Sequence, residues 1–127
     1  MGLKNIQCKE ADIRHINFKP ESFDVIYAHL SLHYFDDRTT TTIFNKLFKV
    51  LRSGGYLFIK CKSVDDALYG KGREIENDMY VSDHIRHFFS KGYMEEKLTK
   101  FKIVKVRRTS SVYYDYKSGF IEAIAQK

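Results

Sequence analysis

The 127-residue sequence has only two cysteines and no tryptophan, and no long apolar run is present. Cys8 and Cys61 stand far apart without a paired spacing, which argues against a metal site or a redox motif and predicts buried, reduced thiols. No stretch approaches the ~20 apolar residues of a membrane helix, and no signal-peptide pattern follows Met1. We therefore expect a cytoplasmic protein with no membrane partner.

Proline is nearly absent as well, since Pro20 is the only one. No linker or internal repeat divides the chain, and the four threonines at residues 39–42 are the one low-complexity segment. The hydrophobic content of 43% is enough for one sizeable core. These features predict a single domain over residues 1–127.

The charges show no concentration that would mark a nucleic-acid-binding arm. The 22 basic and 16 acidic residues give a net charge of +6, but both signs are interspersed along the chain. We therefore expect no nucleic-acid partner. Weak binding of nucleic acid through the net positive charge is kept as one alternative function. Such binding would depend steeply on salt concentration.

The central stretch from Phe23 to Lys60 has the pattern of a strand, a helix and a second strand. Residues 23–28 and 56–59 are short apolar runs, and residues 39–52 between them have helical periodicity. A threonine among residues 39–42 is expected to cap the helix, and Gly54 or Gly55 to end it. Such a unit places both strands in one parallel sheet, with a ligand expected at their carboxyl ends.

The flanking segments complete the expected fold. The sequence predicts a short strand at residues 3–8 and a long mobile loop at residues 61–81. Residues 82–101 predict one or two helical pieces that Gly92 separates. Residues 102–108 and 120–125 predict an antiparallel pair at the edge of the sheet.

Three stretches, in this order, carry a resemblance to a known family. They are DIRHINF at residues 12–18, SFDVIYA with LSLHYF at residues 22–35, and VLRSGGYL at residues 50–57. The chain resembles the second half of a class I S-adenosylmethionine-dependent methyltransferase. In that family an acidic residue ends the third strand, a Phe-Asp-aliphatic fourth strand follows, and a helix ends in a leucine-basic-x-Gly-Gly signature. Residues 84–90 resemble the small bacterial branch related to tellurite-resistance methyltransferases.

The resemblance implies an α/β fold from about Asn5 to the C-terminus. It is a Rossmann-like methyltransferase sheet with parallel strands and a C-terminal antiparallel hairpin. It also implies S-adenosylmethionine as the cofactor and a small-molecule methyl acceptor as the partner.

The same resemblance implies five cofactor-binding residues. Asp12 would accept a hydrogen bond from the adenine amino group, and the backbone amide of Ile13 would meet a ring nitrogen. Ala28, His29 and Leu30 would line the cofactor and the methyl-transfer site after the fourth strand.

The chemistry makes modest demands on the protein, because the sulfonium is already an activated methyl donor. A general base is needed only for a poorly nucleophilic acceptor. His29, His33 and Tyr34 are the candidates, and nothing in the sequence selects one of them. The histidine pairs at 29/33 and 84/87 suggest no metal site, because no carboxylate or cysteine has the spacing of a zinc ligand.

Two elements of the family's cofactor site are missing from the sequence. No Gly-x-Gly pattern precedes Asp12, and no acidic residue follows a second strand to hold the ribose hydroxyls. We therefore expect a partial domain, truncated at its N-terminus and inactive on its own. The alternative is a non-catalytic interaction or oligomerising module with a residual methyltransferase fold.

Because the family's first half is missing from the sequence, we also expect one strand of the sheet to have an open edge. In the complete fold the strand at residues 23–28 lies inside the sheet, so its outer edge needs a partner. Either the strand at residues 3–8 covers this edge, or two chains pair there as a homodimer.

Overall fold

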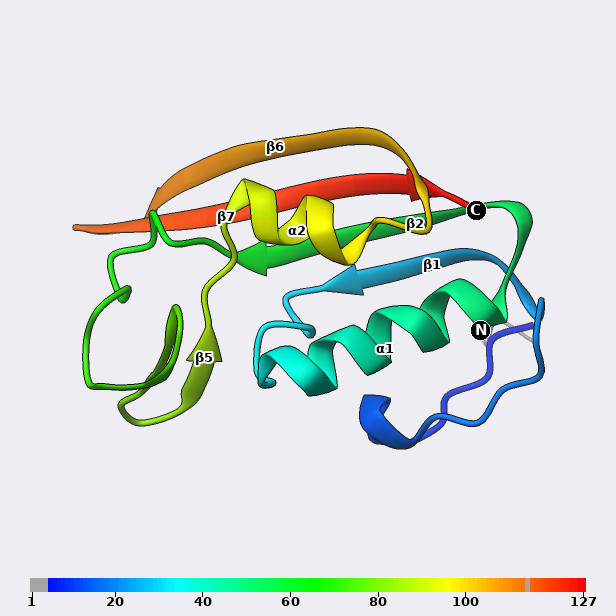
Figure 1. Ribbon diagram of the computed structural model, residues 1–127, viewed down its shortest axis with the longest axis horizontal. Coiled ribbons are helices and arrows are strands. Elements are labelled where there is room, and N and C mark those ends of the chain that lie inside the picture. Colours follow the sequence, from blue (N-terminus) through cyan, green and yellow to red (C-terminus); the bar gives the residue numbers. More distant parts are fainter. Residues whose placement is uncertain (1–4, 114) are drawn as a thin grey trace.

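The computed structural model describes residues 5–113 and 115–127 and contains one mixed four-stranded sheet (Figure 1). The strand order is β1-β2-β7-β6, with β1 and β2 parallel and the other neighbours antiparallel. The strands are β1 (Phe23–His29), β2 (Leu51–Lys62), β6 (Lys102–Tyr113) and β7 (Tyr116–Gln126). The predicted α/β fold with a parallel pair and a C-terminal antiparallel hairpin is therefore confirmed.

The helix between the parallel strands is α1 (Asp37–Val50), and it confirms the predicted crossover. Its buried side chains Ile43, Phe44, Leu47 and Val50 form the apolar stripe that faces the sheet. The expected threonine cap was wrong. Asp36 is the N-cap, and its carboxylate accepts a hydrogen bond of 2.7 Å from the backbone N–H of Thr39.

The expected end of this helix was also wrong. The helix stops at Val50, and Leu51 is already extended, so Gly54 and Gly55 lie inside β2. Gly54 has a φ of +84°, which favours glycine. A Cβ on Gly55 would lie 2.7 Å from the carbonyl oxygen of Asp24, so this glycine permits the close approach of β1 and β2.

The core lies on one face of the sheet. Alternate residues of β2 and β7 are buried there, namely Leu57, Ile59, Cys61, Ile121, Ala123 and Ala125. They pack with α1 and with α2 (Lys91–Lys97), and both helices lie on this face (Figure 1). Neither helix is long and apolar enough to cross a membrane, in the part of the chain that the structure describes.

The expected mobile loop and the helices after it are largely replaced by a second sheet. It consists of β3 (Arg73–Glu76), β4 (Met79–Val81) and β5 (Ile85–His87), all antiparallel. Glu76 pairs with Met79, so a two-residue turn joins β3 to β4. The helical prediction holds only for α2, which contains Gly92 rather than ending at it.

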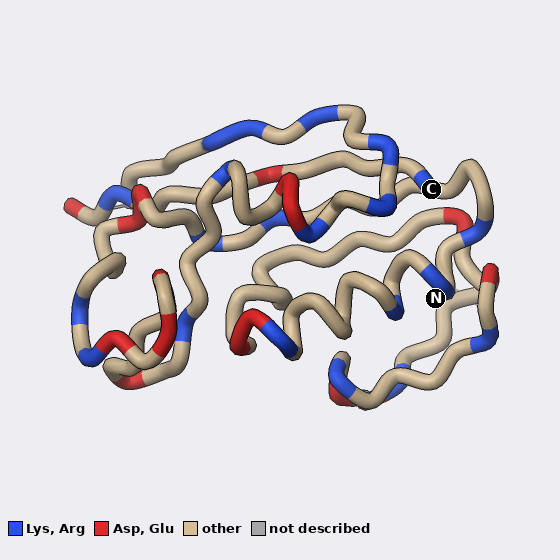
Figure 2. Tube along the Cα trace, viewed as in Figure 1, with Lys and Arg blue, Asp and Glu red and all other residues tan. Residues whose placement is uncertain are grey.

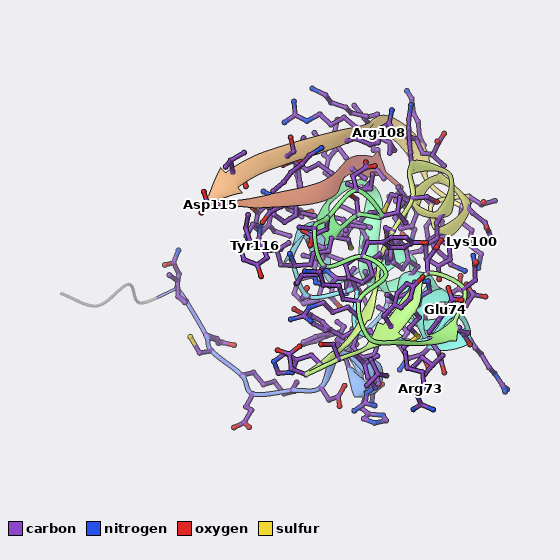
Figure 3. The ribbon with its side chains drawn as sticks, turned by 90° about the vertical axis from the view of Figure 1, so that its left-hand side faces the viewer. Arg73, Glu74, Lys100, Arg108, Asp115 and Tyr116 are labelled. Carbon is purple, nitrogen blue, oxygen red and sulfur yellow. The ribbon has the colours of Figure 1, made fainter. Side chains whose placement is uncertain are left out.

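The expected strand at residues 3–8 is not present over residues 5–8, which have no regular structure, and residues 1–4 lie outside the described part. The segment continues to the short 3-10 helix η1 (Ile13–His15). Figure 3 shows the chain before η1 leading away from the body of the protein. Cys61 is buried as expected, whereas Cys8 is exposed because it lies on this extended segment.

Candidate functional site

A cavity lies at the end of the sheet to which β1 and β2 both point. In Figure 1 the small sheet with β5 lies beyond this end. The cavity has a volume of about 370 Å³ and is lined by Arg14, Tyr34, Phe35, Asp36, Thr39, Ile75, Glu76, Met79 and Ile85. These residues come from η1, the loop after β1, the start of α1 and the small sheet. The carboxyl ends of parallel strands are where open α/β sheets bind ligands.

Apolar and aromatic side chains form much of the wall. Ile75 and Ile85 of the small sheet are both exposed, whereas Met79 is buried. The Tyr34 side chain, 43% exposed, comes from the loop after β1. A wall of this kind can hold an uncharged or aromatic small molecule.

The polar side of the cavity is built on the first turn of α1. Glu76 Oε2 accepts a hydrogen bond of 3.0 Å from the backbone N–H of Asp37. Hydrogen bonds from Thr39 hold the pKa of the Asp36 carboxyl below its ordinary value. The carboxylates of Asp36 and Glu76 thus both lie at the N-terminus of α1, which is the positive end of the helix dipole.

Arg14 of η1 lines the cavity, and it forms a tight ion pair with Asp12, the N-cap of η1. Arg14 Nη2 donates to Asp12 Oδ2 at 2.6 Å, and the backbone N–H of Arg14 donates to Oδ1 at 2.9 Å. These bonds, the side-chain bond first, hold the pKa of Asp12 well below its usual range. The Arg14 guanidinium also lies 5.8 Å from the centre of the Phe35 ring.

Asp12 and Ile13 each keep a group that a contact with an adenine ring would need. The Asp12 side chain is 40% exposed despite its ion pair, so its oxygens can accept a further hydrogen bond. Ile13 is the first residue of η1, so its N–H has no partner within that helix. A carboxylate acceptor beside a free backbone donor matches an amino group next to a ring nitrogen.

Ala28, His29 and Leu30 are placed at the end of β1 but face different surroundings. Ala28 is buried in the core, whereas the His29 ring is exposed and stacks on Tyr27 at 5.9 Å. Leu30 has a φ of +54°, and its N–H donates to the carbonyl oxygen of Lys60 at 2.8 Å. The chain therefore turns at Leu30 toward the cavity loop.

The structure separates the three candidates for a general base. Tyr34 lines the cavity, while His29 lies in a shallow groove of the sheet with Phe58 and Glu122. His33 is buried, and its Nδ1 accepts a hydrogen bond of 3.2 Å from the backbone N–H of Lys62. Of the three, Tyr34 is the one in contact with the cavity.

His33 is poorly suited to accept a proton. Burial, and then the positive charge of Lys62, lower its pKa to about 4. Because Nδ1 is an acceptor, the proton of the neutral ring is on Nε2, which has no hydrogen-bond partner among the described residues. The side chain links the loop after β1 to the end of β2.

The sequence analysis missed the part of the cavity that the small sheet provides. Ile75, Glu76 and Ile85 lie on β3 and β5, in a region interpreted as a loop and a helix. The signal was the Asn77-Asp78 pair between two short runs with β-forming residues, which is typical of a hairpin turn. Asp78 has a positive φ of +60°, a turn conformation that aspartate tolerates better than most residues.

The residues of this chain fit one end of the expected cofactor. Asp12 and Ile13 suit the adenine ring, but the sequence has no glycine-rich loop for the methionine end and no second carboxylate placed for the ribose. These residues therefore do not form a complete cofactor site, and we assign no reaction step to them.

Comparisons with known proteins agree with this fold. Residues 2–59 match the family model described as a methyltransferase domain. No curated protein sequence is significantly similar to the chain.

Solved structures match over nearly the whole chain. A methyltransferase from Methanosarcina mazei has 22% identity and a TM-score of 0.79, over 94% of this chain and 66% of its own. The Burkholderia thailandensis 1,6-didemethyltoxoflavin-N1-methyltransferase, solved with 1,6-didemethyltoxoflavin and S-adenosylhomocysteine, has 18% identity and a TM-score of 0.70, over 92% and 48%. TehB from Haemophilus influenzae has 15% identity and a TM-score of 0.69, over 97% and 41%.

The chain thus spans between about two fifths and two thirds of the length of these three proteins. In sequence over residues 2–59, and in fold over nearly its whole length, the chain resembles the class I S-adenosylmethionine-dependent methyltransferases.

Proposed function

We propose that this chain is part of an S-adenosylmethionine-dependent methyltransferase that acts on a small molecule in the cavity beside Tyr34. The observation that carries the proposal is the cavity itself, about 370 Å³ in volume at the carboxyl ends of β1 and β2. This volume is in the range of small-molecule sites. The Burkholderia relative, whose structure contains a small heterocycle, supports the same substrate class.

In this proposal Asp12 accepts the adenine amino hydrogen bond and Ile13 donates its N–H to the ring. Ala28, His29 and Leu30 flank the cofactor at the end of β1. When bound, S-adenosylmethionine supplies an activated methyl group on its sulfonium. The residues of this chain orient the two molecules and exclude water. The Tyr34 hydroxyl would accept a hydrogen bond from the methyl-accepting substrate in the cavity.

We further propose that residues 1–127 form one partial domain. The glycine-rich loop and the ribose carboxylate would come from outside these residues, so the chain alone would bind the cofactor weakly and turn over no substrate. Two free cysteines suit a reducing compartment, and we place the protein in the cytoplasm.

Calorimetric titration with S-adenosylhomocysteine tests this proposal. We expect weak, saturable binding, and an Asp12→Ala variant that binds about tenfold more weakly because a hydrogen bond to a charged group is lost. Asp83→Ala is the matched control, since Asp83 is also an exposed carboxylate paired with an arginine, Arg86, at 3.2 Å. Absence of saturable binding, or equal losses in both variants, would argue against the proposal.

The alternative is a non-catalytic oligomerising module that keeps the fold. The exposed edge of β1 favours it, because Tyr27 there is 71% exposed. This alternative predicts a stable homodimer without any binding of S-adenosylhomocysteine.

A further inference from the structure

We propose that the cavity takes a small molecule with a positively charged nitrogen, which the carboxylates of Asp36 and Glu76 hold. This inference rests on the proposed function and deepens it, because it names the chemical class of the methyl acceptor. Three features of the cavity carry it: the two carboxylates, an arginine whose charge is already compensated, and a wall of aromatic and apolar side chains.

The two carboxylates reach the cavity from different parts of the chain. Asp36 is the N-cap of α1, and its Oδ1 accepts a hydrogen bond of 2.7 Å from the backbone N–H of Thr39. Glu76 ends β3, and its Oε2 accepts a hydrogen bond of 3.0 Å from the backbone N–H of Asp37. Both carboxylates are therefore fixed on the first turn of one helix, where they lie close together. A carboxylate has about four acceptor sites, so each keeps sites for a ligand.

Neither carboxylate has a cation paired with it. Asp36 and Glu76 form no salt bridge within the described residues. Asp37 differs, because its carboxylate is paired with Lys97 at 2.7 Å. Figure 2 shows acidic residues at the start of α1 and on the small sheet beyond it. The cavity therefore presents negative charge that is available to a ligand.

Arg14 is the one basic side chain among the lining residues, and it is already engaged. Its Nε donates to Asp12 Oδ1 at 3.0 Å, and its Nη2 donates to Oδ2 at 2.6 Å. Such a bidentate contact is the strong form of an arginine–carboxylate pair. A phosphate or carboxylate ligand would have to displace Asp12 from Arg14, and it would meet the charges of Asp36 and Glu76.

The start of α1 is likewise closed to an anion. Anions bind the free N–H groups at the N-terminus of a helix. Here two of the first three helical N–H groups, those of Asp37 and Thr39, already donate to the two carboxylates. The cavity thus disfavours an anion and favours a cation.

The remaining wall suits the body of such a cation. Tyr34 and Phe35 line the cavity, and aromatic rings attract a positive charge. Phe35 already holds a cation in this way, since the Arg14 guanidinium lies 5.8 Å from the centre of its ring. Ile75 and Ile85 supply exposed apolar surface for the rest of the molecule. A protonated nitrogen has no lone pair, so the charged group anchors the molecule, and another of its atoms accepts the methyl group.

A titration with three compounds of similar shape tests the charge preference. The ¹⁵N-labelled chain is titrated at about pH 7 with 2-phenylethylamine, 2-phenylethanol and 3-phenylpropionate, which are positive, neutral and negative. We expect the amine to shift the amides of Tyr34 and Ile85 with a dissociation constant about fivefold lower than that of the alcohol. The carboxylate should bind more weakly than the alcohol. Equal dissociation constants, tightest binding of the carboxylate, or no saturable binding of the amine would overturn the proposal.

Two variants on the same strand locate the charge. Glu76→Gln keeps an oxygen that can accept the hydrogen bond from Asp37 but removes the negative charge. We expect the advantage of the amine over the alcohol to fall from about fivefold to about twofold. Glu74→Gln is the matched control, since Glu74 is also exposed on β3 but does not line the cavity. Asp36→Asn should act like Glu76→Gln, because asparagine also caps a helix. An equal effect of the two glutamine variants would overturn the proposal.

The titration contains no cofactor, so its failure is distinct from a failure of the proposed function. Loss of the amine preference would overturn this inference and leave the calorimetric test with S-adenosylhomocysteine unaffected. Absence of S-adenosylhomocysteine binding would overturn the proposed function. A retained amine preference would then show a cation site without a role in methyl transfer.

Discussion

Replacing Asp66 by alanine is expected to lower the free energy of unfolding by about 3 kcal/mol, because it removes the acceptor of a nearly buried polar network. The carboxylate accepts hydrogen bonds from Lys62 Nζ at 2.9 Å, from the N–H of Leu68 at 2.9 Å and from the N–H of Gly119 at 3.0 Å. The Asp66 side chain is almost inaccessible to solvent. Alanine would leave three donors without a partner.

This network ties together the parts of the chain that carry the cavity wall. It joins the end of β2 to β7 and fixes the turn from which the chain leaves for the small sheet. Asp66→Asn, which keeps an acceptor but no charge, should lose about half as much stability. Asp65→Ala, at the exposed neighbouring residue, should change stability by less than about 0.5 kcal/mol. Urea denaturation of the three variants measures these differences, and a neutral Asp66→Ala would refute the network.

Acidification is expected to destabilise the fold through His33. Burial lowers the pKa of His33 to about 4 in the folded chain, whereas an unfolded histidine titrates near about 6.5. Between these values the unfolded chain binds a proton that the folded chain does not. Stability from this group is therefore complete above about pH 6.5 and falls as the pH drops toward 4, by about 2.5 kcal/mol near pH 4.5.

His33→Asn tests this origin of the pH dependence. An asparagine oxygen can still accept the hydrogen bond from the backbone N–H of Lys62, but it does not titrate. Urea denaturation at pH 7 and at about pH 4.5 should show a much smaller loss in the variant than in the parent chain. An equal loss in both would mean that other groups, not His33, cause the acid sensitivity.

Local patterns predicted the parts of the fold that local sequence determines. The apolar run at β1, the periodicity of α1 and the closing hairpin were all recognised, and each is confirmed. Boundaries were less accurate. Asp36 caps α1 because its carboxylate is free to bond Thr39, whereas the hydroxyls of Thr40 and Thr41 instead bond back to the carbonyls of residues 36 and 37.

The small sheet was missed for a physical reason. Its three strands have three or four residues each and are stabilised by pairing with one another and by contacts with distant residues. One such contact is the hydrogen bond of 2.9 Å from the N–H of His87 to the carbonyl oxygen of His33. A strand of this length has no periodicity of its own, so tertiary contacts decide its conformation.

The same limit applies to the candidate site. Asp12 and the residues after β1 were predicted from a family motif, but part of the cavity wall is formed by the small sheet, which local sequence did not predict. Figure 3 shows Arg73 and Glu74 of β3 apart from Asp115 and Tyr116 at the hairpin tip. No residue of the hairpin lines the cavity among the described residues, so amides of β6 can serve as an internal control for ligand mapping.

The most direct test is a titration of the ¹⁵N-labelled chain with S-adenosylhomocysteine, followed by amide chemical shifts. If this chain carries the adenine end of a methyltransferase site, the amides of Asp12, Ile13 and residues 28–30 will shift with a common saturation curve. Those of Ser110 and Ser111 near the hairpin tip will stay unchanged. Unperturbed amides at residues 12, 13 and 28–30 in millimolar ligand, or shifts confined to the hairpin, would contradict this account.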